Sequence, residues 1–365
     1  MKKSLTALAV MAAVSLPFAA NAGDMEAEVY GKMHGSIDYV NNANDASFFD
    51  SVHMSANSSR LGFKGAADLG GGMKAVWKVE SDVAQGEADG KTGLGTTGIG
   101  NRATYVGLST GAGTVTMGRD ETPVKLISRK TDLFGDQIGD SRNVMQGKVT
   151  DRREGESVQY VSPAVAGAQL AIMTTLSDAK YNSTTGKQDA ANFGGFISAS
   201  VTYKMGKELY AALGYQMADG NSLGKPAAET EGVTRLGLKY SMGAIGVNAL
   251  FQMTSNEGGT KDLGRMAYGV GAAYKMGKMS IKAQYYGATA SVDTKKDEAS
   301  ILAIGVDQKL GDKTTAYVAY AMSMNGADAS AGVSGAGHDN PGGDTGKPGK
   351  GDGAMGLSVG MIHSF

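Results

Sequence analysis

Two glycine-containing strings in this chain match motifs that carry known chemistry. Residues 93–98 have the glycine spacing of a loop that cradles a dinucleotide pyrophosphate, and residues 107–111 have the Gly-x-Ser-x-Gly spacing that presents a nucleophilic serine. Both motifs function where a strand leads into a helix, whereas the neighbouring segments here have the pattern of loops, strands and turns. We therefore expect neither string to form a catalytic or cofactor site, and we expect that the protein is not an enzyme.

Residue types that bind metal ions are present, but not with the spacing of a metal site. The chain has no cysteine, and its four histidines lack the spacing of metal ligands. Four aspartates lie among the glycines of residues 325–353, yet their spacing matches no standard calcium loop. We expect no metal or other cofactor, and we expect residues 325–353 to form a solvated loop outside the sheet.

The elements that would position any functional residue are short segments in which apolar and polar side chains alternate. In residues 245–253 every odd position is apolar, while Asn248 and Gln252 occupy even positions. The final residues 357–365 alternate in the same way and end on Phe365. Period-two alternation with one apolar face predicts β-strands. Because the last strand needs a partner on both edges, we expect it to pair with the first strand, near residues 29–39, and so to close a barrel.

The connections between these segments alternate in length. Short ones are expected at residues 70–72, 109–113, 163–167, 205–207, 241–244, 276–278 and 310–313, and long ones at 41–51, 84–99, 121–150, 178–193, 219–231, 255–264, 291–298 and 325–353. Seven short and eight long connections join 16 strands. Strict alternation places all tight turns at one end, which is typical of membrane barrels with short periplasmic turns and long extracellular loops. The sequence therefore predicts an all-β fold, a 16-stranded antiparallel transmembrane β-barrel.

Parity along the strands places charge inside this barrel. Arg60 and Lys64 share one face of their segment, while Leu61 and Phe63 share the other. An arginine facing lipid at the midplane would cost about 2–4 kcal/mol, so both cations are expected to face the lumen. Polar residues inside and apolar residues outside are the arrangement of a membrane barrel.

The N-terminus indicates export. Two lysines precede an apolar run over residues 5–20, and the small residues at 20 and 22 flank a cleavage site, so residues 1–22 are expected to be a signal peptide and residues 23–365 the barrel domain. No later stretch approaches the roughly 20 apolar residues that a spanning helix needs. Without the two signal lysines, 33 basic residues (35 − 2) face 36 acidic ones. A nucleic-acid partner, which favours a basic excess, is therefore not expected.

Several motifs resemble strands of the general bacterial porins of Gram-negative outer membranes. They are residues 30–32, 58–65, 70–72, 105–108, 113–119 and 157–163 and the terminal Phe365. The resemblance implies a homotrimeric outer-membrane channel whose third long loop folds inward and narrows the pore. It also implies that Phe365 is an assembly signal for the barrel assembly machinery, and that the barrel contacts outer-membrane lipid and lipopolysaccharide.

The resemblance further implies a constriction in which wall arginines face carboxylates of the third loop. The matching positions are Arg60, Arg102 and either Arg152 or Arg153 on the wall, and Asp132 and Asp136 on the loop. Adjacent residues of a strand point to opposite faces, so the sequence does not choose between Arg152 and Arg153. Lys32 and Lys64 are further expected pore-lining residues.

Three functions remain open at this point. The leading hypothesis is passive diffusion of small hydrophilic solutes and ions through a water-filled channel. An anion-selective channel of the phosphate type is the alternative, because the third loop also carries Lys125, Arg129 and Lys130. The third hypothesis is a non-conducting structural protein or adhesin of the outer membrane.

Overall fold

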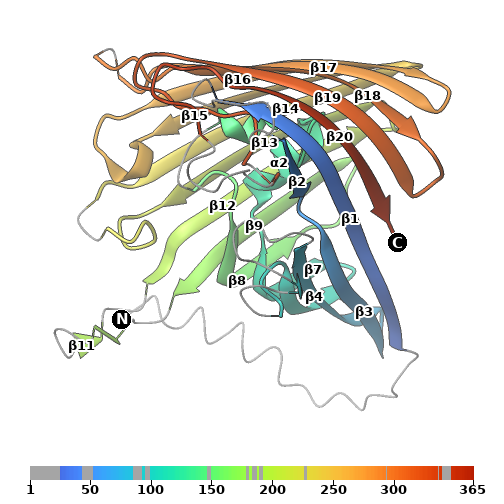
Figure 1. Ribbon diagram of the computed structural model, residues 1–365. Coiled ribbons are helices and arrows are strands. Elements are labelled where there is room, and N and C mark those ends of the chain that lie inside the picture. The colour runs from blue at the N-terminus through green and yellow to red at the C-terminus, as the bar shows by residue number, and fades with distance from the viewer. Residues whose placement is uncertain are drawn as a thin grey trace.

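The computed structural model describes residues 25–42, 52–84, 93–94, 99–145, 149–177, 181–182, 187–188, 192–225, 228–292, 294–335, 337–338 and 347–365 (Figure 1). The expected signal peptide, residues 1–22, lies outside this range. Among the described residues, none of the helices has the length and apolar character needed to cross a membrane.

All the barrel strands belong to one sheet of 18 strands. Two of the 18 are short additions to longer strands. β2 (Val52–Ala56) pairs with residues 35–39 of β1, and β5 (Gly93–Leu94) pairs with β4. The other 16 form the closed antiparallel barrel. They are β1 (Met25–Asn41), β3 (Arg60–Gly70), β4 (Met73–Ala84), β6 (Thr104–Thr110), β7 (Gly113–Glu121), β8 (Arg153–Val161), β9 (Ala168–Ser177), β12 (Asn192–Met205), β13 (Leu209–Ala218), β14 (Glu231–Met242), β15 (Ile245–Ser255), β16 (Arg265–Met276), β17 (Met279–Ala288), β18 (Ala299–Lys309), β19 (Thr314–Asn325) and β20 (Met355–Ser364). The predicted strand number and the alternation of short and long connections are confirmed.

The seam of the barrel joins the first and last strands, as the sequence predicts. β1 and β20 pair from Lys32 opposite Ser364 to Asn41 opposite Met355. Beyond the strand, Phe365 and Gly31 exchange two backbone hydrogen bonds of 3.1 Å each. The Phe365 ring lies over Gly31, where a Cβ atom would collide with it. The terminal residue is therefore part of the ladder that closes the barrel.

Deleting Phe365 is expected to reduce the amount of folded barrel, because the seam loses both hydrogen bonds and the ring contact with Gly31. Phe365→Tyr, which keeps the ring and the backbone, is the matched control. The measurement is the fraction of heat-modifiable protein on a gel after refolding in detergent. Equal fractions for the deletion and for wild type would contradict the prediction.

Over part of the barrel, the two faces of the sheet have the predicted arrangement, with polar residues inside and apolar residues outside. On β15, Phe251 and Met253 are exposed on the outer face, whereas Asn248 and Gln252 are buried inside. On β18 and β19 the lumen face is mixed and not polar throughout. Asp307 and Ser323 lie on this face, together with five apolar residues: Ala299, Ile301, Ala303, Ala319 and Ala321. These positions are apolar because two extracellular loops pack against them inside the barrel.

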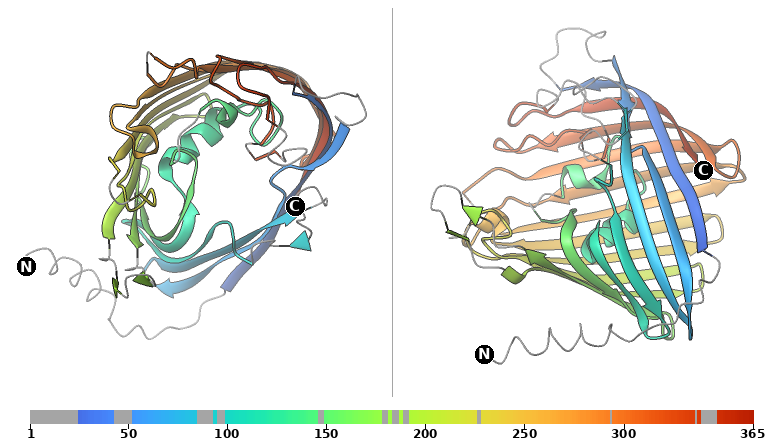
Figure 2. Two further views of the ribbon diagram at one scale, coloured as in Figure 1. Left: turned by 60° about the vertical axis from the view of Figure 1, so that its left-hand side comes forward. Right: turned by 90° about the horizontal axis from the view of Figure 1, so that it is seen from below.

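The first of these is the third loop, residues 122–152 between β7 and β8, which enters the barrel (Figure 2). It begins with helix α2 (Pro123–Thr131), which has Thr122 as its N-cap and a proline in its first turn. The helix lies against β12 to β15. Gly214 and Gly237 make this approach possible, because a Cβ at Gly214 would lie 2.8 Å from Ile127 Cδ1 and one at Gly237 would lie 2.5 Å from Ile127 Cγ2. A short 3₁₀ helix (Ser141–Asn143) follows in the same loop.

The second is the terminal loop, residues 326–354 between β19 and β20, of which residues 326–335, 337–338 and 347–354 are described. Ala329, Ala331 and Val333 are buried in one apolar cluster with Phe134 and Ile138 of the third loop. These residues lie outside the sheet, as expected, but the expectation that they are solvated is wrong. Two smaller elements lie in other long connections: β10 (Tyr181–Asn182) pairs with β11 (Lys187–Gln188), and a 3₁₀ turn spans Glu257–Gly259.

Candidate pore constriction

Arg235 on β14 anchors the third loop to the barrel wall. Its side chain is 0% exposed, and its guanidinium donates to the Val124 carbonyl at 3.1 Å and to Ser128 Oγ at 3.0 Å. It also donates to both carboxylate oxygens of Asp151, at 3.0 Å each. Burial would raise the pKa of Asp151, but the Arg235 guanidinium holds that pKa below its usual value. The start and the end of the loop are thus tied to one position on the wall.

The middle of the loop is held by β17. Lys282 Nζ donates to the Leu133 carbonyl at 2.9 Å, and Gln284 Nε2 donates to Asp132 Oδ1 at 2.8 Å. The other oxygen of Asp132 accepts from Ser141 N at 2.9 Å and from Ser141 Oγ at 2.7 Å. Asp132, one of the expected loop carboxylates, therefore bonds to the loop and to β17.

Asp136, the other expected loop carboxylate, lies among three cations. It pairs with Lys32 on β1 at 2.9 Å, with Arg129 at the end of α2 at 2.7 Å, and with Arg142 at 3.0 Å. Burial would raise the pKa of Asp136, but these cations, led by Arg129, hold it well below its usual range. Asp136 is therefore ionised at neutral pH, and it links the loop to the wall beside the barrel seam.

The wall arginines gather around a cavity of about 400 Å³ inside the barrel. Arg60 and Arg153 line this cavity together with Lys32 and Arg129. Arg102 lies beside it, because its Nε donates at 2.7 Å to Glu80, which also lines the cavity. The structure thus brings Arg60, Arg102, Arg153 and Lys32 close to the loop.

Two of the expected residues lie apart from this cavity. Arg152 pairs with Glu154 at 2.8 Å, is 39% exposed and faces the outer side of the third loop. Arg153 pairs instead with Glu121 at 2.7 Å and lines the inner cavity, so the two adjacent arginines point in opposite directions. Lys64 pairs with Glu28 at 3.0 Å and lies over the Tyr30 ring.

Four further residues belong to the site: Lys78, Glu80, Glu121 and Arg129. Parity places Lys78 and Glu80 in the lumen, since they alternate with outward residues of β4, and Arg129 is one of the loop cations considered from the sequence, whereas Glu121 was not expected. We call the following nine residues the constriction cluster. The cations are Lys32, Arg60, Lys78, Arg102, Arg129 and Arg153, and the carboxylates are Glu80, Glu121 and Asp136.

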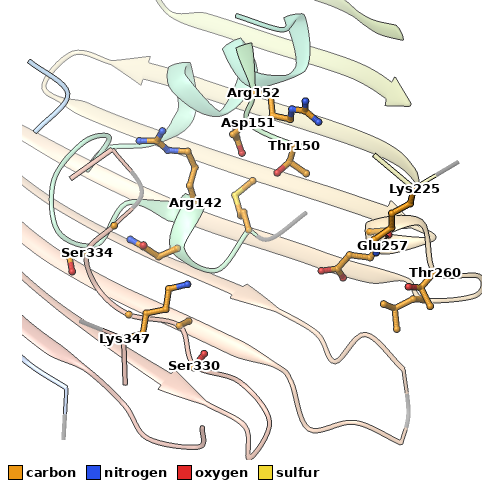
Figure 3. A pocket seen from close by; sticks show the side chains of 17 residues that line it. Arg142, Thr150, Asp151, Arg152, Lys225, Glu257, Thr260, Ser330, Ser334 and Lys347 are labelled. Carbon is orange, nitrogen blue, oxygen red and sulfur yellow. Dashed lines mark hydrogen bonds between the residues drawn. The ribbon is translucent and has the colours of Figure 1, made fainter. Parts of the chain in front are cut away.

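A larger vestibule of about 850 Å³ lies on the outer side of the third loop (Figure 3). Arg142 and Arg152 enter it from the third loop, Lys225 and Glu257 from the opposite side, and Lys347 from the terminal loop. Most of the residues that line the vestibule have polar or charged side chains. An aqueous route from the outside therefore reaches the third loop through a polar chamber.

The comparisons with known proteins agree with this architecture. The sequence matches the Gram-negative porin family over residues 7–328. It is 29% identical over 380 aligned residues to outer membrane porin protein 32 of Delftia acidovorans, covering 100% of both chains. It is 33% identical over 187 residues to the major outer membrane protein P.IB of Neisseria meningitidis serogroup B, covering 49% of this chain and 50% of that protein.

Solved structures show the same fold. An anion-selective porin from Comamonas acidovorans superposes with a TM-score of 0.75 at 24% identity, covering 94% of this chain and 100% of that one. Salmonella typhi OmpF superposes with a TM-score of 0.66 at 14% identity, covering 93% and 97%.

A closed 16-stranded barrel with a polar chamber and a cluster of charged side chains inside it defines an outer-membrane channel. The chain belongs to the Gram-negative porin family. It is a multi-pass outer-membrane protein that conducts small hydrophilic solutes and ions by passive diffusion, and it is not an enzyme. This function takes the place of the hypothesis of a non-conducting structural protein or adhesin.

Proposed function

We propose that the channel is anion-selective and that the constriction cluster supplies the selectivity. The observation that carries this proposal is that each carboxylate of the cluster is shared by two or more cations. Glu80 contacts Lys78 and Arg102, Asp136 contacts Lys32 and Arg129, and Glu121 contacts Arg153 and Lys125. Each carboxylate is therefore outnumbered by the cations that surround it.

The charge balance has a direct consequence for ions. Six cations against three carboxylates leave an excess of three positive charges (6 − 3) around the passage. Screening at 0.1 M salt acts over about 10 Å, so an ion in a narrow passage experiences this excess. Low-dielectric walls focus the field further. Anions are therefore attracted and cations repelled. One structural relative is described as an anion-selective porin, which supports the same sign.

The test is the reversal potential of the purified protein in planar bilayers under a KCl gradient. The reversal potential is expected to have the sign of chloride selectivity. Its magnitude should decrease near 1 M salt, where the screening length falls to about 3 Å. A reversal potential of cation sign at low salt would overturn the proposal. A potential near zero would show that the excess charge does not reach the ions.

Raising the pH is expected to reduce the anion selectivity. Burial, together with the positive charge of Arg153, lowers the pKa of Lys125 in the third loop to about 8. Lys125 is therefore mostly charged at pH 7 and loses its proton as the pH rises through 8, which removes one positive charge beside Glu121. Reversal potentials at several pH values measure the effect. Lys125→Arg keeps its charge and should lose this part of the pH dependence; an unchanged dependence would contradict the assignment.

We further propose the association states and processing that the porin resemblance implies. Three copies are proposed to form a homotrimer, which cross-linking in isolated outer membranes tests directly. Residues 1–22 are proposed to be a cleaved signal peptide, so that N-terminal sequencing of the mature protein should begin at Gly23. Lipopolysaccharide is the proposed lipid partner of the outer leaflet, and its co-purification with the trimer is the measurement.

Phe365 is also proposed to act as the signal that the barrel assembly machinery reads. Phe365 is 42% exposed at the end of the seam, where another protein could contact it. Phe365→Ala should then fold in detergent but accumulate poorly in the outer membrane. Equal defects in both settings would assign Phe365 a structural role only.

A further inference from the structure

The terminal loop does not extend away from the barrel but returns into it. Figure 2 shows part of this red segment inside the barrel outline. Val333 is 0% exposed, and it belongs to the apolar cluster that also holds Phe134 and Ile138 of the third loop. Water is excluded from this part of the lumen, so ions cannot pass there.

Polar contacts fasten the terminal loop to the barrel wall. Ser323 Oγ donates to the Ala331 carbonyl at 2.7 Å, and the Asn325 side chain both donates to that carbonyl at 3.0 Å and accepts from Ala331 N at 2.9 Å. On the opposite side of the seam, His338 Nε2 lies 3.2 Å from Asp38 Oδ2 of β1, and both side chains are fully buried. The loop is thus attached to β19 and to β1.

Other contacts fasten the terminal loop to the third loop. Gly139 N donates to the Val333 carbonyl at 2.8 Å, and Asn143 Nδ2 donates to the same oxygen at 3.4 Å. Gly337 has a φ of +85°, and a Cβ there would collide with the carboxylate of Asp136 and the guanidinium of Arg142. The backbone of the terminal loop therefore rests directly on the ion cluster of the third loop.

We propose that the terminal loop is a second constricting segment of this channel. It fills the part of the lumen beside β1 and β18 to β20, braces the third loop, and confines the aqueous route to the side of the wall arginines. Ser330 and Ser334 of the terminal loop also form part of the vestibule wall. The size limit of the channel is therefore set by two loops together. This proposal concerns pore width and does not depend on the sign of the ion selectivity.

An engineered disulfide can test the proposal, because the chain has no cysteine of its own. A Cβ at Gly356, on the lumen face of β20, would lie 3.2 Å from Val333 Cγ2, so that cysteines at these two positions would have their side chains in contact, as a disulfide requires. The test protein combines Val333→Cys and Gly356→Cys with Ala331→Asp, which places a carboxylate in the apolar cluster and disfavours docking of the loop. The matched control carries the two cysteine substitutions alone.

The test protein is refolded under oxidising conditions, so that the bond holds the loop in place during folding, and reductant is added only after insertion into the bilayer. In the oxidised state, its single-channel conductance and its exclusion limit for neutral polyethylene glycols of graded size should equal those of wild type. On reduction the conductance should rise and the exclusion limit should shift to larger polymers, while the control should not change.

Two results would overturn the proposal: failure of the two cysteines of the control to form a bond under oxidising conditions, or identical conductance and exclusion limit of the test protein before and after reduction. Reversal potentials recorded in the same bilayers report the ion selectivity separately. A wrong sign of selectivity therefore leaves this test intact, and a failure of this test leaves the anion proposal intact.

Discussion

Replacing Arg235 by methionine is expected to free the third loop and to destabilise the barrel. The substitution leaves Asp151 buried without its partner and removes the bonds to Val124 and Ser128. Breaking a buried ion pair by removing one partner costs about 3–5 kcal/mol. The loop should then leave its place on β13 and β14, so that the single-channel conductance becomes larger and noisier.

The matched control for this prediction is Arg265→Met. Arg265 is also a buried arginine, but its partners are Glu257 and Asp297 of outer connections, not the third loop. Both variants should unfold at lower temperature than wild type, while only Arg235→Met should release the third loop and so give the larger and noisier conductance. Because Arg235 lowers the pKa of Asp151, the stabilisation from the pair is present at neutral pH and is lost as the pH falls below about 4. A wild-type conductance in Arg235→Met would show that Arg235 does not hold the loop.

Neutralising the cations of the constriction cluster and neutralising one of its carboxylates are expected to shift the ion selectivity in opposite directions. Neutralising Arg60 and Arg102 to glutamine lowers the cluster from six cations to four against three carboxylates, so the reversal potential should move toward cations. Asp136→Asn leaves six cations against two carboxylates and removes the carboxylate partner of Lys32 and Arg129, while Arg142 keeps Asp140, so the reversal potential should move strongly toward anions. Both shifts should shrink at molar salt.

Two controls sharpen this prediction. Lys261→Gln removes a charge from an exposed outer connection and should leave the reversal potential unchanged. Asp132→Asn should change selectivity much less than Asp136→Asn, since the Asp132 carboxylate is bound to Ser141 and Gln284. Unchanged reversal potentials in both the arginine and the Asp136 variants at low salt would remove the constriction cluster from the narrowest part of the pore.

The strands of this protein were predictable because a membrane barrel has a regular sequence pattern. Side chains alternate between lipid and lumen, and the turns at one end are short, so strand number and boundaries follow from parity and spacing. The predicted pairing of the last strand with the first is confirmed down to the hydrogen bonds of Phe365. Lys32 and Arg60, which face each other across β1 and β3, were both expected in the lumen.

The packing of the third loop and the terminal loop inside the barrel was not predictable to the same degree. Residues 326–354 are rich in glycine and small residues, a composition typical of a solvated loop, and the four small apolar side chains that it buries leave no periodic pattern. The choice between Arg152 and Arg153 needed the backbone geometry at the start of β8. Arg129 and Asp136 lie seven positions apart and meet only because the chain turns after α2, where Asp136 adopts a positive φ of 63°.

Gly214 and Gly237 give the wall behind α2 an influence on permeation that is not electrostatic. A single methyl group at either position would meet Ile127 and push the helix inward, toward the water-filled side of the lumen. These glycines belong to the wall that α2 covers, so a larger residue at either position would narrow the route without contacting a permeating ion. Natural variation at these two positions can therefore change how large a nutrient or an antibiotic enters the cell while the charge pattern, and with it the preference for anions or cations, stays the same.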